Sequence, residues 1–102
     1  INILGTEYEI LYKETEKMKK IDAGGLCDPR SKKIYIADIS ESGIFEDPTV
    51  HQGIIVRHEI IHAMLHESGL SFNSEWATEE EMVDFFALQF HKMADIFKKL
   101  GV

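Results

Sequence analysis

One segment constrains the fold more than any other, the stretch between Asp47-Pro48 and Gly69. An aspartate followed by proline is typical of a helix start, because the carboxylate caps free N–H groups and proline fits the first helical position. Glycine is typical of the residue after a helix, where a positive φ is common. We therefore predict a helix from Pro48 to about Ser68, weakened locally by Gly53.

The sequence before this helix predicts short strands. Apolar and polar residues alternate over 8–13, which indicates a strand in a first hairpin with residues 1–4, turning at Gly5-Thr6. A second hairpin is indicated by apolar residues on both sides of the turn Asp28-Pro29-Arg30-Ser31. We expect a loop or a short helix at residues 14–20, and a loop at residues 40–47.

The sequence after the first helix predicts a second long helix, from near Ser74 or Thr78 to just before Gly101. Strands followed by helices are the order of an α+β domain. We therefore expect a single domain over 1–102, with a small antiparallel sheet of β-hairpins packed on two long C-terminal helices.

Composition narrows the class of partner. The chain of 102 residues has a net charge of −7, which argues against nucleic acid, since phosphate binding needs clustered Lys and Arg. No apolar run approaches the roughly 18 residues that a membrane span needs. The single cysteine, Cys27, excludes a disulfide framework within the chain and fits a cytoplasmic protein.

The first predicted helix carries the motif His58-Glu59-Ile60-Ile61-His62. Residues four apart lie on one face of a helix, so both imidazoles can reach one Zn²⁺. Glu59 is then placed to act as a general base on a water at the metal without being a ligand. Chance could produce the motif, but both histidines share a face with Ile54, Ile61 and Leu65, and buried paired histidines need a partner.

A third ligand is expected from the second helix, because catalytic zinc has three protein ligands and a water. Glu80 is our choice. Asp84, one turn further on, is placed to accept the free ring N–H of a ligating histidine. Both share a face with residues expected to pack inward, Val83, Ala87 and Leu88. Glu79 and Glu81 remain alternatives, although Thr78 and Glu81 have the spacing of a capping box and we assign Glu81 to the cap.

The other histidines are expected to lie outside the set of ligands. His66 extends the row of histidines by one turn, but about 12 Å separates it from His58 along a straight helix, so we predict a cleft-wall or structural role. His91 lies three turns from Glu80, and His51 is expected at the surface in the first helical turn. The aromatic residues after the motif are expected in the core: Trp76, Phe85, Phe86, Phe90 and Phe97.

The stretches RHEIIHAMLH at 57–66 and EEMVDFFA at 80–87 resemble the ImmA/IrrE-like metallopeptidases, and more narrowly their short phage and prophage members. The resemblance places the family's ligand glutamate at Glu80 and its Asn/Asp at Asp84. Met82 and Val83 depart from the family pattern, which has Glu and Ala there. The resemblance implies a minimal zincin-like domain of the gluzincin type, encoded by a phage or prophage, that cleaves a protein such as a phage regulator.

These observations lead us to expect a zinc-dependent peptidase, with ligands His58, His62 and Glu80 and the catalytic base Glu59. The oxyanion donor is left open among Tyr12, Tyr35, Arg57 and His66. The alternative is a zinc-stabilised module that binds a protein without catalysis. A structural site usually has four protein ligands, so the fourth position separates the two interpretations.

Overall fold

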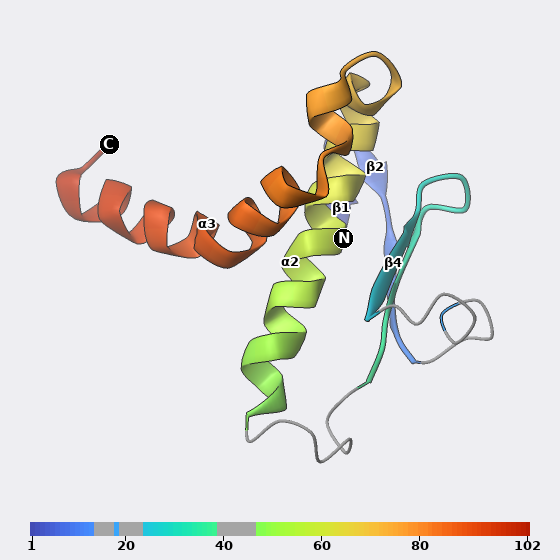
Figure 1. The fold of residues 1–102 in the computed structure, drawn as a ribbon, viewed down its shortest axis with the longest axis horizontal. Helices are drawn as coiled ribbons and strands as arrows, with labels where there is room; N and C mark the ends of the chain where they lie inside the picture. The colour runs from blue at the N-terminus through green and yellow to red at the C-terminus, as the bar shows by residue number, and fades with distance from the viewer. Residues whose placement is uncertain (14–17, 19–23, 39–46) are drawn as a thin grey trace.

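The computed structural model describes residues 1–13, 18, 24–38 and 47–102. Figure 1 shows an α+β arrangement, with small sheets from the N-terminal half beside two long helices from the C-terminal half. The predicted α+β class is therefore confirmed. The elements are β1 (Asn2–Ile3), β2 (Thr6–Glu7), β3 (Glu9–Tyr12), β4 (Gly25–Asp28), β5 (Lys33–Ile36), α2 (Pro48–Glu67) and α3 (Glu80–Leu100), with 3-10 turns at Leu70–Phe72 and Glu75–Thr78. The loops predicted at 14–20 and 40–47 lie almost wholly outside the described residues.

The strands of the described part of the chain form two sheets rather than one antiparallel sheet. β1 and β2 pair as a hairpin, whereas the larger sheet has the order β3-β5-β4. The predicted second hairpin is confirmed, because β4 pairs antiparallel with β5. The prediction for β3 was wrong: it leaves the first hairpin and pairs parallel with β5, with Glu9 opposite Lys33. Local turn signals predict hairpins, but they cannot predict a pairing between strands this far apart in the sequence.

α2 begins and ends as the sequence predicts. The Asp47 side chain accepts a hydrogen bond from the Thr49 N–H, and Gly69 follows the helix with a φ of 84°. One side of α2 packs on the sheets, where Ala63 is fully buried in a cluster with residues in or next to the strands: Ile3, Tyr8, Ile34 and Ile36. Burying these side chains is the main force that holds the helix against the sheet.

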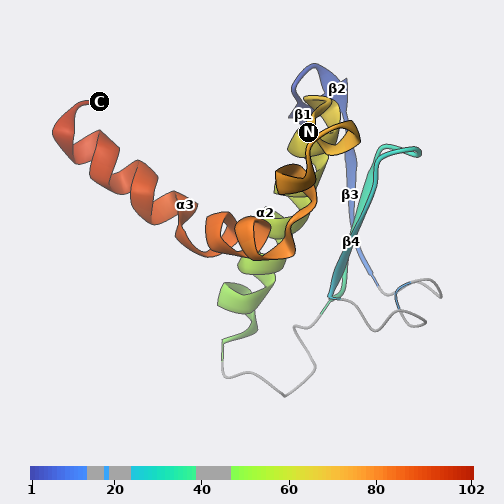
Figure 2. The ribbon, with the colours of Figure 1, turned by 45° about the horizontal axis from the view of Figure 1, so that its top comes forward.

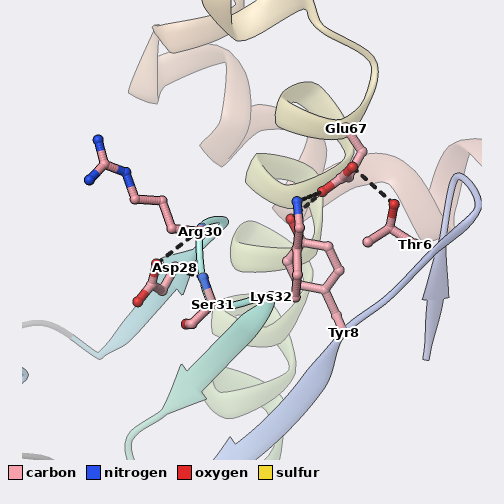
Figure 3. A network of polar contacts seen from close by, with 7 residues as sticks. All are labelled: Thr6, Tyr8, Asp28, Arg30, Ser31, Lys32 and Glu67. Carbon is pink, nitrogen blue, oxygen red and sulfur yellow. Dashed lines mark hydrogen bonds and ion pairs between the residues drawn. The ribbon is translucent and has the colours of Figure 1, made fainter.

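The last turn of α2 is tied to the strands by Glu67 (Figure 3). Its carboxylate accepts hydrogen bonds from the Tyr8 hydroxyl at 2.7 Å and the Thr6 hydroxyl at 3.1 Å, and pairs with Lys32 Nζ at 2.6 Å. The Lys32 and Tyr8 hydrogen bonds hold the pKa of Glu67 down at about 2. One carboxylate thus links the helix to β2, to the residue before β3 and to the turn before β5.

α3 packs on α2 only through its first half. Val83 and Ala87 are buried, and Val83 forms a second apolar cluster with Leu65 and Ala77. The outer half projects away from α2 and the sheets in both views (Figures 1 and 2). The prediction that the aromatics form the core was therefore wrong for four of the five, because these side chains are exposed: Trp76, Phe85, Phe90 and Phe97.

Two smaller predictions about α3 were also wrong. Leu88 is 43% exposed rather than packed inward. The capping box does not form, since Glu79 is the N-cap without a side-chain hydrogen bond and the Thr78 hydroxyl donates to the Glu75 carbonyl instead. Among the described residues, no helix is long and apolar enough to cross a membrane.

Candidate metal centre

α2 brings the two histidines of the motif together. His58 and His62 lie one turn apart, and their Nε2 atoms are 3.1 Å from each other. Their side chains are 19% and 24% exposed, so both lie at the boundary between the helix contacts and solvent. The face they occupy is therefore not the fully buried stripe that the sequence predicted: of its three apolar members, Leu65 is buried, whereas Ile54 and Ile61 are partly exposed.

The start of α3 supplies a carboxylate to the same point. Glu80 Oε2 lies 3.0 Å from His58 Nε2, and Glu80 Oε1 lies 3.0 Å from His62 Nε2. Among the described residues, His58, His62 and Glu80 form a group whose potential ligand atoms lie within 4.8 Å of one another. Glu79 and Glu81 are not members of this group.

Asp84 lies behind His58. Its Oδ1 is 2.8 Å from His58 Nδ1, so the ring can donate its Nδ1–H to this carboxylate. Nε2 then presents its lone pair to the centre, in the tautomer that a metal ligand requires. The sequence analysis predicted this contact from the position of Asp84 one helical turn after Glu80.

The three groups can converge on a divalent metal ion. Neighbouring ligands around a tetrahedral Zn²⁺ at about 2.0–2.1 Å lie roughly 3.3 Å apart. The two imidazole Nε2 atoms are 3.1 Å apart, and each has a different Glu80 oxygen at 3.0 Å. When Asp84 holds the neutral tautomer of His58, the lone pair of Nε2 faces a carboxylate oxygen at 3.0 Å. Two acceptors at that distance are held together by either a proton or a metal ion, and two nitrogens with one carboxylate are a donor set that zinc accepts.

Glu59 is the buried acid of the site. It exposes 7% of its surface, the only polar or charged side chain that is buried among the described residues. Burial raises its pKa to about 6, and the nearby Glu80 adds to the increase, whereas His58 and a hydrogen bond from the backbone N–H of Cys27 act in the opposite direction. A carboxylate with a pKa nearer to neutrality is better suited to take and return a proton.

β4 holds Glu59 in place, which the sequence analysis did not anticipate. A Cβ at Gly25 would lie 2.8 Å from Glu59 Cγ and 2.9 Å from its Oε1, so a side chain is excluded where strand and helix meet. Cys27, two residues on, donates its N–H to the same carboxylate. The pair Gly24-Gly25 carried a signal for this approach, because glycine within a strand often marks close contact with another backbone or side chain.

The centre opens into a cavity of about 650 Å³ between α2, β4 and the start of α3. His66 lines it, in contact with the Phe72 ring at a centroid distance of 4.8 Å, as the predicted cleft-wall role requires. His51 also lines it, so its assignment to the surface was incomplete. Of the four candidate oxyanion donors only His66 lies on this wall, and Arg57 instead donates to the Ala87 carbonyl at 2.6 Å. His91 is exposed on α3 and does not line the cavity.

No known protein family, curated protein or solved structure matches this chain.

Proposed function

We propose that this chain is a zinc-dependent hydrolase that cleaves peptide bonds. The observation that carries the proposal is the position of Glu59, buried next to the triangle of His58, His62 and Glu80. A bound divalent ion supplies Lewis acidity, because it lowers the pKa of water towards 7 and polarises a carbonyl oxygen. The resemblance to the ImmA/IrrE-like metallopeptidases supports the same assignment.

The position of each residue assigns it one role in the proposed reaction. His58, His62 and Glu80 would hold the ion, and Asp84 would fix the ring of His58. Glu59 takes a proton from the attacking water as its oxygen adds to the carbonyl carbon. Glu59 then returns that proton to the amine nitrogen as the carbon–nitrogen bond breaks. His66 faces the cavity and is our candidate for the oxyanion donor.

The cavity supports a peptide as substrate. Among the described strands β4 lies at the edge of its sheet, and residues 24–27 line the cavity along its length. An extended peptide can align with such an edge through main-chain hydrogen bonds. The N–H of Cys27 is engaged by Glu59, so the peptide would align with the remaining part of the edge.

The alternative is a zinc-stabilised module that only binds a protein. Structural zinc sites are usually closed by four protein ligands. Among the described residues the group contains three, and His66 is not one of them. This count supports a centre with a position for water over a closed structural site.

The test compares Glu59→Gln, His62→Ala and the parent chain, with Glu81→Gln as the control for loss of a nearby charge. We measure zinc by elemental analysis and cleavage with a pool of quenched fluorescent peptides. Glu59→Gln should keep about one zinc per chain and lose cleavage by about 10²-fold or more, whereas His62→Ala should lose both. Equal cleavage by Glu59→Gln and the parent would refute the base. A parent chain that binds zinc but cleaves no peptide would support the binding module.

A further inference from the structure

An apolar stripe with coiled-coil spacing runs along the whole of α3. Apolar residues recur at alternating intervals of three and four, and we call this set the seam: Val83, Phe86, Phe90, Met93, Phe97 and Leu100. This spacing is typical of a helix that packs along another helix. Only the first part of the seam packs within the chain, since Val83 is buried whereas Phe97 and Leu100 are 46% and 72% exposed.

The seam continues into an apolar cavity on the body of the protein. This second cavity has a volume of about 280 Å³ and lies between the C-terminal end of α2 and the first half of α3. Phe86 and Phe90 of the seam form one of its walls, and the opposite walls are almost wholly apolar: Leu4, Met64, Leu70 and Trp76. The cavity and the seam therefore form one continuous surface, away from the metal centre, which has none of these residues in its lining.

We propose that two copies of this chain form a two-fold dimer, in which their α3 helices pack antiparallel along the seam. The two-fold axis passes between Phe90 and Met93, so Phe97 of each copy enters the apolar cavity of the other beside Phe86. Because of the two-fold axis, each copy contributes both the Phe97 side chain and the cavity that receives it, as an isologous interface requires. This proposal does not depend on the proposed hydrolase function.

The exposed area is sufficient for a dimer. The half-exposed side chains of the seam and cavity include Trp76 at 52%, Phe90 at 56% and Leu100 at 72%. With 150–250 Å² for each aromatic side chain, the surface exposes on the order of 700 Å² of apolar area per copy. A standard interface buries roughly 800 Å² per partner, and a monomer rarely exposes an apolar patch this large.

Charge favours a second copy in the antiparallel orientation. The first turn of α3 is acidic, with Glu81 outside the metal centre, and the last turn carries Lys98 and Lys99. Antiparallel packing places the basic end of one helix beside the acidic start of the other. The opposed helix dipoles add to this preference, whereas a parallel pair would align like charges.

The first experiment is sedimentation equilibrium of the full chain at about 1–100 μM, comparing Phe97→Glu with Phe85→Glu. Phe85 is the matched control, because it is 53% exposed on the same helix but lies off the seam. The parent and Phe85→Glu should be dimers, and Phe97→Glu should weaken the dimer by more than about 30-fold. A monomeric parent, or equal weakening by both variants, would overturn the proposal.

A cross-linking experiment keeps the proposal testable if Phe97→Glu fails to fold. Met93→Cys and Asp95→Cys are each made in a Cys27→Ala background and treated with a short bis-maleimide. Met93 lies next to the proposed axis, whereas Asp95 lies on the opposite face of α3. We expect a cross-linked dimer from Met93→Cys only. Equal cross-linking of both variants, or a ladder of larger species, contradicts a closed two-fold pair.

Discussion

The contact between β4 and α2 at Gly25 gives the sharpest test of how the site is built. In Gly25→Ala the new methyl would lie 2.8 Å from both Glu59 Cγ and Ile55 Cγ2, whereas ordinary contacts begin at 3.4 Å. The Glu59 and Ile55 side chains must therefore move by about 0.6 Å relative to β4, and both atoms lie close to the backbone of α2. Overpacking of this kind costs about 1–3 kcal/mol.

Gly24→Ala is the matched control, because its Cβ would meet Ile55 Cδ1 at 2.9 Å, the end of a flexible side chain that can turn away. Both changes reduce the entropy of the unfolded chain equally, so their difference isolates the contact with Glu59. Urea unfolding followed by circular dichroism measures it. With a slope of about 2 kcal/mol per molar, the midpoint of Gly25→Ala should lie about 0.5–1.5 M below that of Gly24→Ala.

Equal midpoints for the two variants would refute the argument that this strand needs glycine to approach Glu59. The same pair of variants also tests the link to function. If the proposed base is positioned by β4, Gly25→Ala should bind zinc as the parent does but cleave more slowly. Gly24→Ala should match the parent in both measurements.

Three further predictions follow from the metal centre and the Glu67 network. Zinc at about 100 times its dissociation constant should stabilise the fold by about 2.7 kcal/mol, which raises Tm by on the order of 10 °C or more. A Tm that neither zinc nor a chelator changes would contradict the proposed site. Asp84→Asn should weaken zinc binding about 10–100-fold, because the ring of His58 loses its carboxylate partner, whereas Glu81→Gln should leave the affinity unchanged. Equal zinc affinities of the two variants in a competition titration would show that Asp84 does not support the site. The pKa of Glu67 is lowered to about 2 from about 4.3 in an unfolded chain, so its stabilising effect is present above about pH 4.3 and is lost as the pH falls towards 2. The difference in urea midpoint between the parent and Glu67→Gln should therefore be constant from pH 7 to 5.5 and shrink at pH 3, and a difference that does not change with pH would show that the charge of Glu67 plays no part.

The features that the sequence predicts correctly are those that depend on residues close together in the chain. Asp47-Pro48 and Gly69 gave the limits of α2, and the turn at 28–31 gave the second hairpin. The spacing of His58 and His62 predicted that their rings meet, because helix geometry fixes that distance. Glu80 was chosen from a run of three acids because it shares a helix face with Asp84, and it is the member that joins the histidines.

Other features depend on contacts between distant segments, and these the sequence could not predict. The burial of Glu59 needs β4 at its side, which no spacing within α2 reveals. The period of α3 predicts an apolar stripe, but it does not say which partner covers that stripe. The aromatics were therefore assigned to the core, whereas Phe90 and Phe97 lie on a surface that the chain itself leaves exposed.

The parallel pairing of β3 with β5 has a consequence for how the chain assembles. β4 and β5 are joined by a tight turn, so they can pair as a hairpin within microseconds. β3 can add only after a loop has closed between Glu9 and Lys33, which costs chain entropy before any contact is gained. Docking of β3 is therefore expected to be the late, rate-limiting event, and the Glu67 contacts to Thr6 and Tyr8 would form with it rather than before it.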